Sequence, residues 1–203
     1  MAESEPDVID LLAGVEPGSR LDAIRAQRPQ ARENAQRSHL ALFAPGSPGG
    51  VSAEERHALA AFVAGLHGEV SVLAFHRTRL DQPNARPGLS AALDEEIARG
   101  SARGPYGRYP TGPLSVEDRP GPIHRVAGEN RARLGARLST AFEHAHLLVF
   151  HPRDAGPAAL QALLDAGWST TDIVTLSQLV AFLSFQIRVI AGLRALAAAG
   201  GNS

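Results

Sequence analysis

The sequence predicts an all-α fold for the whole chain. Apolar residues recur with helical period over most of its length, and two serine-led capping patterns mark helix starts. No stretch alternates convincingly with the period of two that a half-buried strand requires. The chain has 203 residues, 44% of them hydrophobic and 20% charged, which is enough to bury a sizeable core. We therefore expect one globular domain spanning residues 1–203.

The first 45 residues are expected to wrap the core as short helices. Ser19 is a suitable N-cap for the second of these helices, which must stop before Pro29. The segment APGSPGG at 44–50 then breaks the helical pattern with its prolines and glycines. The helices predicted in this region are 6–13, 19–27 and 30–43.

The central region, residues 52–99, carries the clearest local signals. Ser52 and Glu55 form an S-x-x-E capping box, and the apolar positions that follow are spaced as on one face of a helix. The helices predicted here are 53–66, 69–80 and 89–99. We expect the first two to form the centre of the fold together with a long apolar helix at 170–198.

Residues 100–128 form a loop rich in glycine, proline and arginine, without helical period. Loops this long inside a compact domain are usually functional, interfacial or mobile. Helical period returns over residues 129–199, where the predicted helices are 129–150, 157–166 and 170–198. The last helix is apolar around much of its circumference, which is typical of buried helices and of subunit interfaces. We therefore expect a homo-oligomer, either a dimer or a larger assembly.

The composition excludes several chemistries. The chain contains no cysteine, so disulfides, thiolate metal sites, iron–sulfur clusters and thiol nucleophiles are ruled out. All 20 basic residues are arginine, which excludes a Schiff-base or P-loop lysine. The formal net charge of -1 does not favour nucleic acid or an anionic membrane surface as a partner.

The sequence favours a cytoplasmic protein outside the membrane. The first ten residues are acidic and lack the basic-then-apolar pattern of a signal peptide. The apolar region 173–199 contains polar and charged side chains that would be costly in hydrocarbon, which favours a buried helix over a membrane span. These residues are Gln178, Gln186, Arg188 and Arg194.

Two segments resemble a known family. The segment AEERHALAAFVAGLHGEVSVLAFHRTRL at 53–80 resembles the core of the carboxymuconolactone decarboxylase / alkylhydroperoxidase D superfamily. The segment LLDAGWSTTDIVTLSQLVAFLSFQIRVIAGL at 163–193 resembles the C-terminal helix pair of that family. The resemblance implies an alkylhydroperoxidase D-like (AhpD-like) helical bundle that forms oligomers. It also implies a subfamily without cysteine, whose members often pair with a cysteine-bearing relative.

The resemblance also places candidate site residues. Peroxidase-type members have an acidic residue on the first core helix, a C-x-x-C motif at the start of the second, and a histidine four residues later. On this register His76 matches the histidine, while Glu69 and Val72 stand at the two cysteine positions. His57 stands where the acidic residue usually falls, and Arg188 matches an arginine common near the end of the last helix.

Without sulfur, this chain is not expected to be a thiol peroxidase by itself, because that cycle needs an attacking thiolate and a resolving thiol. The decarboxylase branch instead moves protons on a lactone acid. His76 acting with His57 and Glu69 would suit such acid–base chemistry on a small organic acid, without a cofactor. Two alternatives remain open. In the first, His76 is a core histidine without a catalytic role. In the second, the protein is a non-catalytic subunit that binds or regulates a cysteine-bearing relative.

Two further groups of residues have site-like composition. In the 100–128 loop, arginines surround Tyr106 and Tyr109, and Arg108 lies between the tyrosines. With Arg188, these residues are candidates for binding a carboxylate, although the loop also suits a solvated or subunit-capping role. His144, His146 and His151 form an H-x-H-x4-H pattern. Positions i and i+2 of a helix diverge by roughly 200°, so we expect these histidines on a helix flank or interface and predict no metal site.

Overall fold

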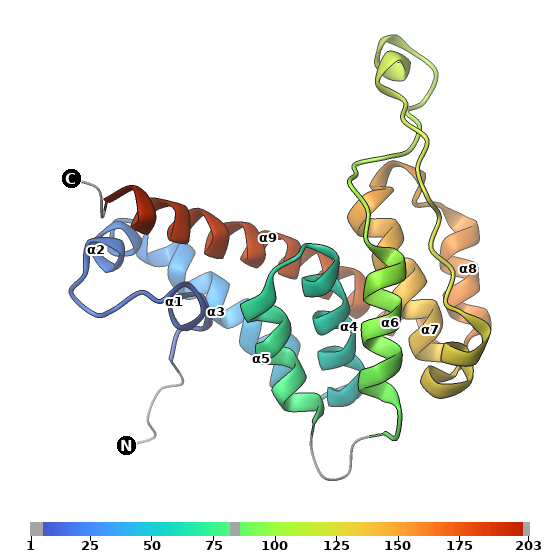
Figure 1. The fold of residues 1–203 in the computed structure, drawn as a ribbon, viewed down its shortest axis with the longest axis horizontal. Helices are drawn as coiled ribbons and strands as arrows, with labels where there is room; N and C mark the ends of the chain where they lie inside the picture. The colour runs from blue at the N-terminus through green and yellow to red at the C-terminus, as the bar shows by residue number, and fades with distance from the viewer. Residues whose placement is uncertain (1–5, 82–85, 201–203) are drawn as a thin grey trace.

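The computed structural model describes residues 6–81 and 86–200, and over these residues it confirms the all-α prediction (Figure 1). The described chain forms nine α-helices and two 3₁₀-helices, with no strand. The α-helices are α1 (Val8–Ala13), α2 (Arg20–Ala26), α3 (Pro29–Phe43), α4 (Ala53–Leu66), α5 (Val70–Leu80), α6 (Leu89–Gly100), α7 (Gly128–Phe150), α8 (Pro157–Asp165) and α9 (Thr170–Gly200), and the 3₁₀-helices are η1 (Pro113–Glu117) and η2 (Pro152–Asp154). Each predicted helix is present, and its ends lie within two residues of the prediction.

The centre of the molecule is α4. The Ser52–Glu55 capping box opens it, with Ser52 Oγ accepting from the Glu55 amide at 3.2 Å and Glu55 Oε2 accepting from the Ser52 amide at 2.9 Å. Residues 58–64 are fully buried because α4 packs against α3, α5, α6, α7 and α9. At Gly65 a Cβ would lie 2.6 Å from the Ile97 side chain, so only glycine lets α6 approach this closely.

Helix α9 runs along the length of the molecule (Figure 1). It begins at a second capping box, in which Ser169 and Asp172 exchange hydrogen bonds of 3.0 and 3.2 Å. Among the described residues it is the one helix long and apolar enough to cross a membrane, but it packs as a core helix on α1, α4 and α7. Its outer face leaves three large apolar side chains exposed, namely Val174, Phe185 and Leu196.

The helices α1, α2 and α3 lie at one end of the molecule, against α9 (Figure 1). Asp10 holds them together by binding Arg25 at 2.7 Å and by pairing with Arg32. Arg194 of α9 donates to the carbonyl of Leu12 at 2.6 Å. The expected wrapping segment, 1–45, therefore covers α9 most closely, and its residues 1–5 lie outside the described part of the chain.

Residues 101–127 form an arm that projects beyond the helices (Figure 1). Gly107 and Arg119 pair through an isolated antiparallel bridge, and η1 lies at the tip. The sequence predicted a loop here but neither of these features. The base of the arm is fixed to the end of α7, where the Tyr106 amide donates to the Phe150 carbonyl at 2.6 Å.

Helix α7 differs from its prediction in one respect. It is interrupted at Gly135, which has φ 76° and ψ 166°, so two helical pieces meet there at a kink. Glycine adopts this left-handed region readily, whereas a residue with a Cβ is strained in it. A continuous helix over 129–150 was therefore the wrong expectation at this one residue.

Candidate functional site

Two of the predicted catalytic residues meet directly. His57 comes from α4 and His76 from α5, and these helices are packed together through a tight turn at Gly68, which has φ 68°. The Nδ1 atoms of the two rings lie 3.1 Å apart, within hydrogen-bonding distance. Such a contact requires one ring nitrogen to donate a proton and the other to accept it. The two histidines therefore share one proton between their Nδ1 atoms.

A third histidine and three phenylalanines enclose this pair. His39 of α3 lies beside Phe43, with ring centroids 4.9 Å apart, and Phe43 stacks on His57 at 5.3 Å and lies 4.7 Å from His76. Phe75 of α5 and Phe182 of α9 complete the walls around His39. We call His39, His57 and His76 with these three phenylalanines the first histidine cluster.

All three rings of the first cluster are neutral at pH 7. Burial is the main cause, because it disfavours the charged imidazolium and lowers the pKa of His39 and His57 to about 4. The same effect holds the pKa of the fully buried His76 well below 6.5. The positive charge of Arg79 lowers all three pKa values further, and Arg56 adds to the effect at His57.

Several buried polar side-chain atoms of α3, α5 and α9 have no hydrogen-bond partner in the described chain. Nε2 of His76 and Nδ1 of His39 are buried without a hydrogen bond, and so are both amide atoms of Gln186. Gln186 lies four residues beyond Phe182 and therefore on the same face of α9. Each such buried atom costs about 1–3 kcal/mol. By contrast, Nε2 of the partly exposed His57 makes no hydrogen bond within the described chain and is not fully buried, so it remains accessible.

The third predicted catalytic residue, Glu69, does not join the pair. It is the N-cap of α5 rather than part of its first turn, and its Oε1 accepts from the Ser71 hydroxyl at 2.9 Å and pairs with Arg194 at 2.6 Å. Burial alone would raise the pKa of Glu69, but these hydrogen bonds lower it overall. Seven residues of helix place it about 10 Å along the axis from His76. The register that aligned the two residues does not bring them together.

The four predicted substrate-binding residues are also separated. Tyr106 and Tyr109 lie in the arm, where Tyr106 packs on His151 at 5.2 Å and the Arg153 guanidinium lies 4.0 Å from the Tyr109 ring. The backbone of Arg108 binds Asp154 at 3.0 Å, and its side chain is exposed. These contacts hold the arm in place. Arg188 lies elsewhere, on α9.

The histidines of the H-x-H-x4-H pattern form a second histidine cluster, with His124 added from the arm. His144 and His146 point to different partners, because Nε2 of His144 binds Ser177 Oγ at 3.0 Å and Nε2 of His146 donates to the Gly100 carbonyl at 3.1 Å. His124 stacks on His146 with centroids 5.1 Å apart. Within residues 6–81 and 86–200, no three or more His, Cys, Asp or Glu side chains are arranged so that they could hold a metal ion.

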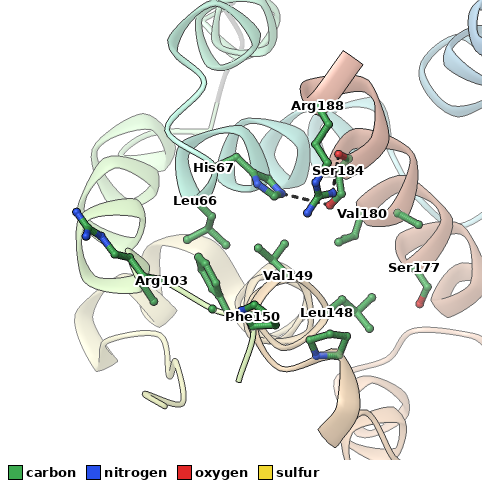
Figure 2. A pocket seen from close by; sticks show the side chains of 15 residues that line it. Leu66, His67, Arg103, Leu148, Val149, Phe150, Ser177, Val180, Ser184 and Arg188 are labelled. Atoms are coloured by element: carbon green, nitrogen blue, oxygen red, sulfur yellow. Dashed lines mark hydrogen bonds between the residues drawn. The ribbon is translucent and has the colours of Figure 1, made fainter. Parts of the chain in front are cut away.

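The cavities lined by the described residues include three of about 470 to 750 Å³. The second cluster lines one of about 470 Å³, and Arg56 with Asp172 lines one of about 550 Å³. The third, of about 750 Å³, lies between α7 and α9 and is lined by Arg188 (Figure 2). His57 and His76 line none of these three cavities. Of the pair, His57 is partly exposed and His76 is fully buried.

Four residues of these sites were not predicted from sequence, namely His39, His67, His124 and Gln186. A signal for His39 was present, because His39 and Phe43 are four residues apart and so share one face of their helix. His67 follows the last residue of α4 and lines the 750 Å³ cavity. The burial of Gln186 follows only from the packing of α9 and had no local signal.

Similarity to known proteins provides no independent assignment. No profile of a known protein family matches this chain, and no curated protein or solved structure is detectably similar to it. The alkylhydroperoxidase D-like resemblance therefore stays a prediction that depends on residues 53–80 and 163–193.

Proposed function

We propose that this protein is an acid–base enzyme that acts on a small organic acid at the His57–His76 pair. The observation that carries the proposal is the 3.1 Å contact between the two Nδ1 atoms, with one ring accessible and the other fully buried. His57 is the base that meets the substrate. His76 is a positioning residue, which departs from the sequence-based expectation that His76 itself performs the chemistry.

The proposed chemistry depends on which ring donates the shared proton. If Nδ1 of His57 donates to Nδ1 of His76, the accessible Nε2 of His57 carries a lone pair and can accept a proton. The imidazolium formed in this way keeps its hydrogen bond to His76. The same proton then returns to another carbon of the substrate, which completes an isomerisation. Donation in the opposite direction would leave Nε2 of His57 protonated and unable to act.

The surroundings of the pair favour an anionic substrate. The charged side chains that lower the pKa values of the three histidines are Arg79 and Arg56, and both carry a positive charge. Phe43 and Phe75 supply apolar walls beside the rings. A small acid with an apolar body matches both features. The resemblance to the decarboxylase branch of the family supports the same substrate class.

The direct test is deuterium incorporation. A panel of small unsaturated and lactone carboxylic acids is incubated with the full chain in D₂O, and proton NMR follows exchange at the carbons next to the carbonyl and carboxylate groups. We expect the protein to catalyse exchange in at least one acid. The absence of exchange across the panel would contradict the acid–base proposal.

Variants assign the two roles. His57→Gln should abolish exchange because it removes the base. His76→Asn keeps an acceptor near the position of Nδ1 and should retain part of the activity with an altered pH profile, whereas His76→Leu should lose it. His144→Gln is the matched control, because a glutamine amide can still donate to Ser177. Equal loss of activity in the control would show that the effect is not specific to the pair.

A second candidate function is a non-catalytic subunit. Large apolar side chains are exposed both on α9, at Phe185 and Val174, and on the arm, at Val116 and Leu114. Exposed apolar surface of this kind is common at protein interfaces. On this reading the chain forms homo-oligomers or binds a cysteine-bearing alkylhydroperoxidase-like relative in the cytoplasm, and His76 only fills the core.

Light scattering after size exclusion separates the two candidates when combined with the exchange assay. A monomer that catalyses exchange supports the enzyme alone. A dimer or larger species in which Phe185→Glu restores the monomer supports the interface on α9. Activity that appears only when a cysteine-bearing relative is added, and that survives His57→Gln, supports the subunit.

A further inference from the structure

The largest of the three cavities lies between α7 and α9, away from the first histidine cluster. Its volume is about 750 Å³, within the range of small-molecule sites. Figure 2 shows apolar side chains from three elements around it, including Leu66, Val149 and Val180. The start of the arm, at Gly104 and Pro105, also lines it.

The charged residues of this cavity are all of one sign. Arg103 and Arg188 line it, and no aspartate or glutamate does. The other two cavities differ, because Glu143 and Asp154 line the 470 Å³ cavity and Asp172 lines the 550 Å³ cavity. The cavity between α7 and α9 is therefore the one of the three whose charge suits an anion.

Its polar groups are concentrated at one end. There, Nε2 of His67 lies 3.2 Å from Ser184 Oγ, and the Arg188 guanidinium donates to the Ser184 carbonyl at 2.8 Å (Figure 2). Burial, and then the charge of Arg188, lower the pKa of His67, so its ring is neutral at pH 7. The Arg103 guanidinium lies on the opposite side and is turned outward (Figure 2).

A comparison of two serines on α9 shows that Ser184 is the available one. Ser177 and Ser184 are seven residues apart, and both line the cavity and face a histidine. The Ser177 hydroxyl already makes two hydrogen bonds. It donates to the Ile173 carbonyl at 2.8 Å and therefore accepts from His144. In the described chain the Ser184 hydroxyl has His67 as its only partner and remains free to accept from or donate to a ligand.

We propose that this cavity binds a carboxylate with an alkyl or aryl body. The carboxylate lies at Arg188 and Ser184, where a guanidinium and a hydroxyl both donate to it. The apolar body covers Leu66, Val149 and Val180, because removing these side chains from water favours binding. Arginine suits this role because its planar fork matches a carboxylate.

This site is distinct from the proposed catalytic pair. His57 and His67 belong to the same helical segment and are ten residues apart, about 15 Å along the axis. A ligand at Arg188 therefore does not contact His57. This second site goes beyond the proposed function. A carboxylic acid bound there would act as an effector or be carried by the protein.

Isothermal titration calorimetry on the full chain tests the proposal with three probes of equal chain length, namely decanoate, decanol and decyltrimethylammonium. We expect decanoate to bind more tightly than decanol and the cation not to bind. Arg188→Gln should weaken decanoate binding by about ten- to hundredfold and leave decanol binding nearly unchanged. Arg37→Gln on α3 makes the same charge change at an exposed residue and should have no effect.

A second variant tests the location. Ala181 is exposed and lines the cavity, so Ala181→Trp should fill it and prevent decanoate binding without disturbing the core. Circular dichroism checks that each variant is folded. Equal affinity for all three probes, or decanoate affinity that is unchanged in both Arg188→Gln and Ala181→Trp, would overturn the proposal. Because these variants leave His57 and His76 intact, failure here is distinguishable from failure of the deuterium exchange test.

Discussion

The two histidine clusters differ in what their ring nitrogens do. In the second cluster, His146 donates to the Gly100 carbonyl and His151 bridges Asp154 and the Pro122 carbonyl, so these rings connect the arm, α6 and α7. In the first cluster, His57 and His76 contact each other, and the remaining nitrogen of His76 has no partner. The comparison indicates that the second cluster serves mainly to hold the fold, whereas the rings of the first cluster make no hydrogen bond to other parts of the described chain.

The pKa values alone do not separate the clusters. Burial lowers the pKa of His146 to about 4, the same value as for His39 and His57. A perturbed pKa is common at functional sites, but burial also produces it in structural histidines. The distinction comes from hydrogen-bond partners. Nδ1 of His144 and Nε2 of His124 are exceptions in the second cluster, because both are buried without one.

The largest expected effect is acid destabilisation, to which both clusters contribute. The unfolded chain binds protons on these histidines near pH 6.5, whereas folded His39 and His146 bind them only near pH 4. The stability present above pH 6.5 is therefore lost as the pH falls toward 4, by up to about 1.4 kcal/mol per pH unit for each buried histidine. Urea unfolding at a series of pH values measures this slope.

The double variant His39→Phe/His76→Leu measures how much the first cluster contributes to this loss of stability. It removes two groups that must stay neutral in the folded state, so the slope between pH 6.5 and 4 should become shallower. If the slope is unchanged, the acid sensitivity arises in the second cluster and in the carboxylate ion pairs, and the first cluster is less buried than its pKa values imply.

Glu96→Ala should have the next largest effect, because it disrupts the support of the second cluster. The carboxylate is fully buried, and its Oε1 accepts from Asn130 at 2.8 Å and from the Ala127 amide at 3.1 Å. Its Oε2 lies 3.1 Å from His124 but is not aligned for a hydrogen bond. Removing it leaves two donors without a partner, at a cost of about 1–3 kcal/mol each. A denaturant midpoint within experimental error of the parent would contradict this structural role.

A matched pair of substitutions compares the clusters directly. His146→Leu removes the donor to the Gly100 carbonyl, which is buried, and should cost about 1–3 kcal/mol. His76→Leu removes a ring whose Nε2 is already unpaired, and the accessible His57 can turn to solvent, so we expect a change within about 1 kcal/mol. Thermal or chemical unfolding provides both values. The reverse order would mean that the first cluster is the structural one.

Much of the fold could be predicted from sequence because its signals are local. Capping boxes at Ser52 and Ser169, the turn at Gly68 and the helical spacing in α4 each depend on residues within a few positions of one another. The kink at Gly135 was missed because a single glycine is compatible with a continuous helix. The bridge between Gly107 and Arg119 was missed because it joins residues of a segment without periodicity.

The candidate site was only partly predictable, for the same reason. His57 and His76 were placed on adjacent helices by the register, and these helices lie side by side. Glu69 was placed near them by chain spacing, but its side chain is held by Arg194, which is 125 residues away in the sequence. His39 and Phe182 reach the cluster through the packing of α3 and α9. Such long-range contacts leave no pattern in a single sequence.

The last prediction concerns the tautomer of each histidine ring. It involves the smallest energy difference but separates the two clusters most sharply. Ser177 donates to Ile173, so His144 must carry its proton on Nε2, and His146 must do the same to bind Gly100. The proposed base requires the opposite tautomer at His57, with the proton on Nδ1. Long-range ¹H–¹⁵N correlation spectra at pH 7 distinguish the two forms by nitrogen shift. A proton on Nε2 of His57 would leave the accessible nitrogen unable to accept another, and the first cluster would then share the structural role of the second.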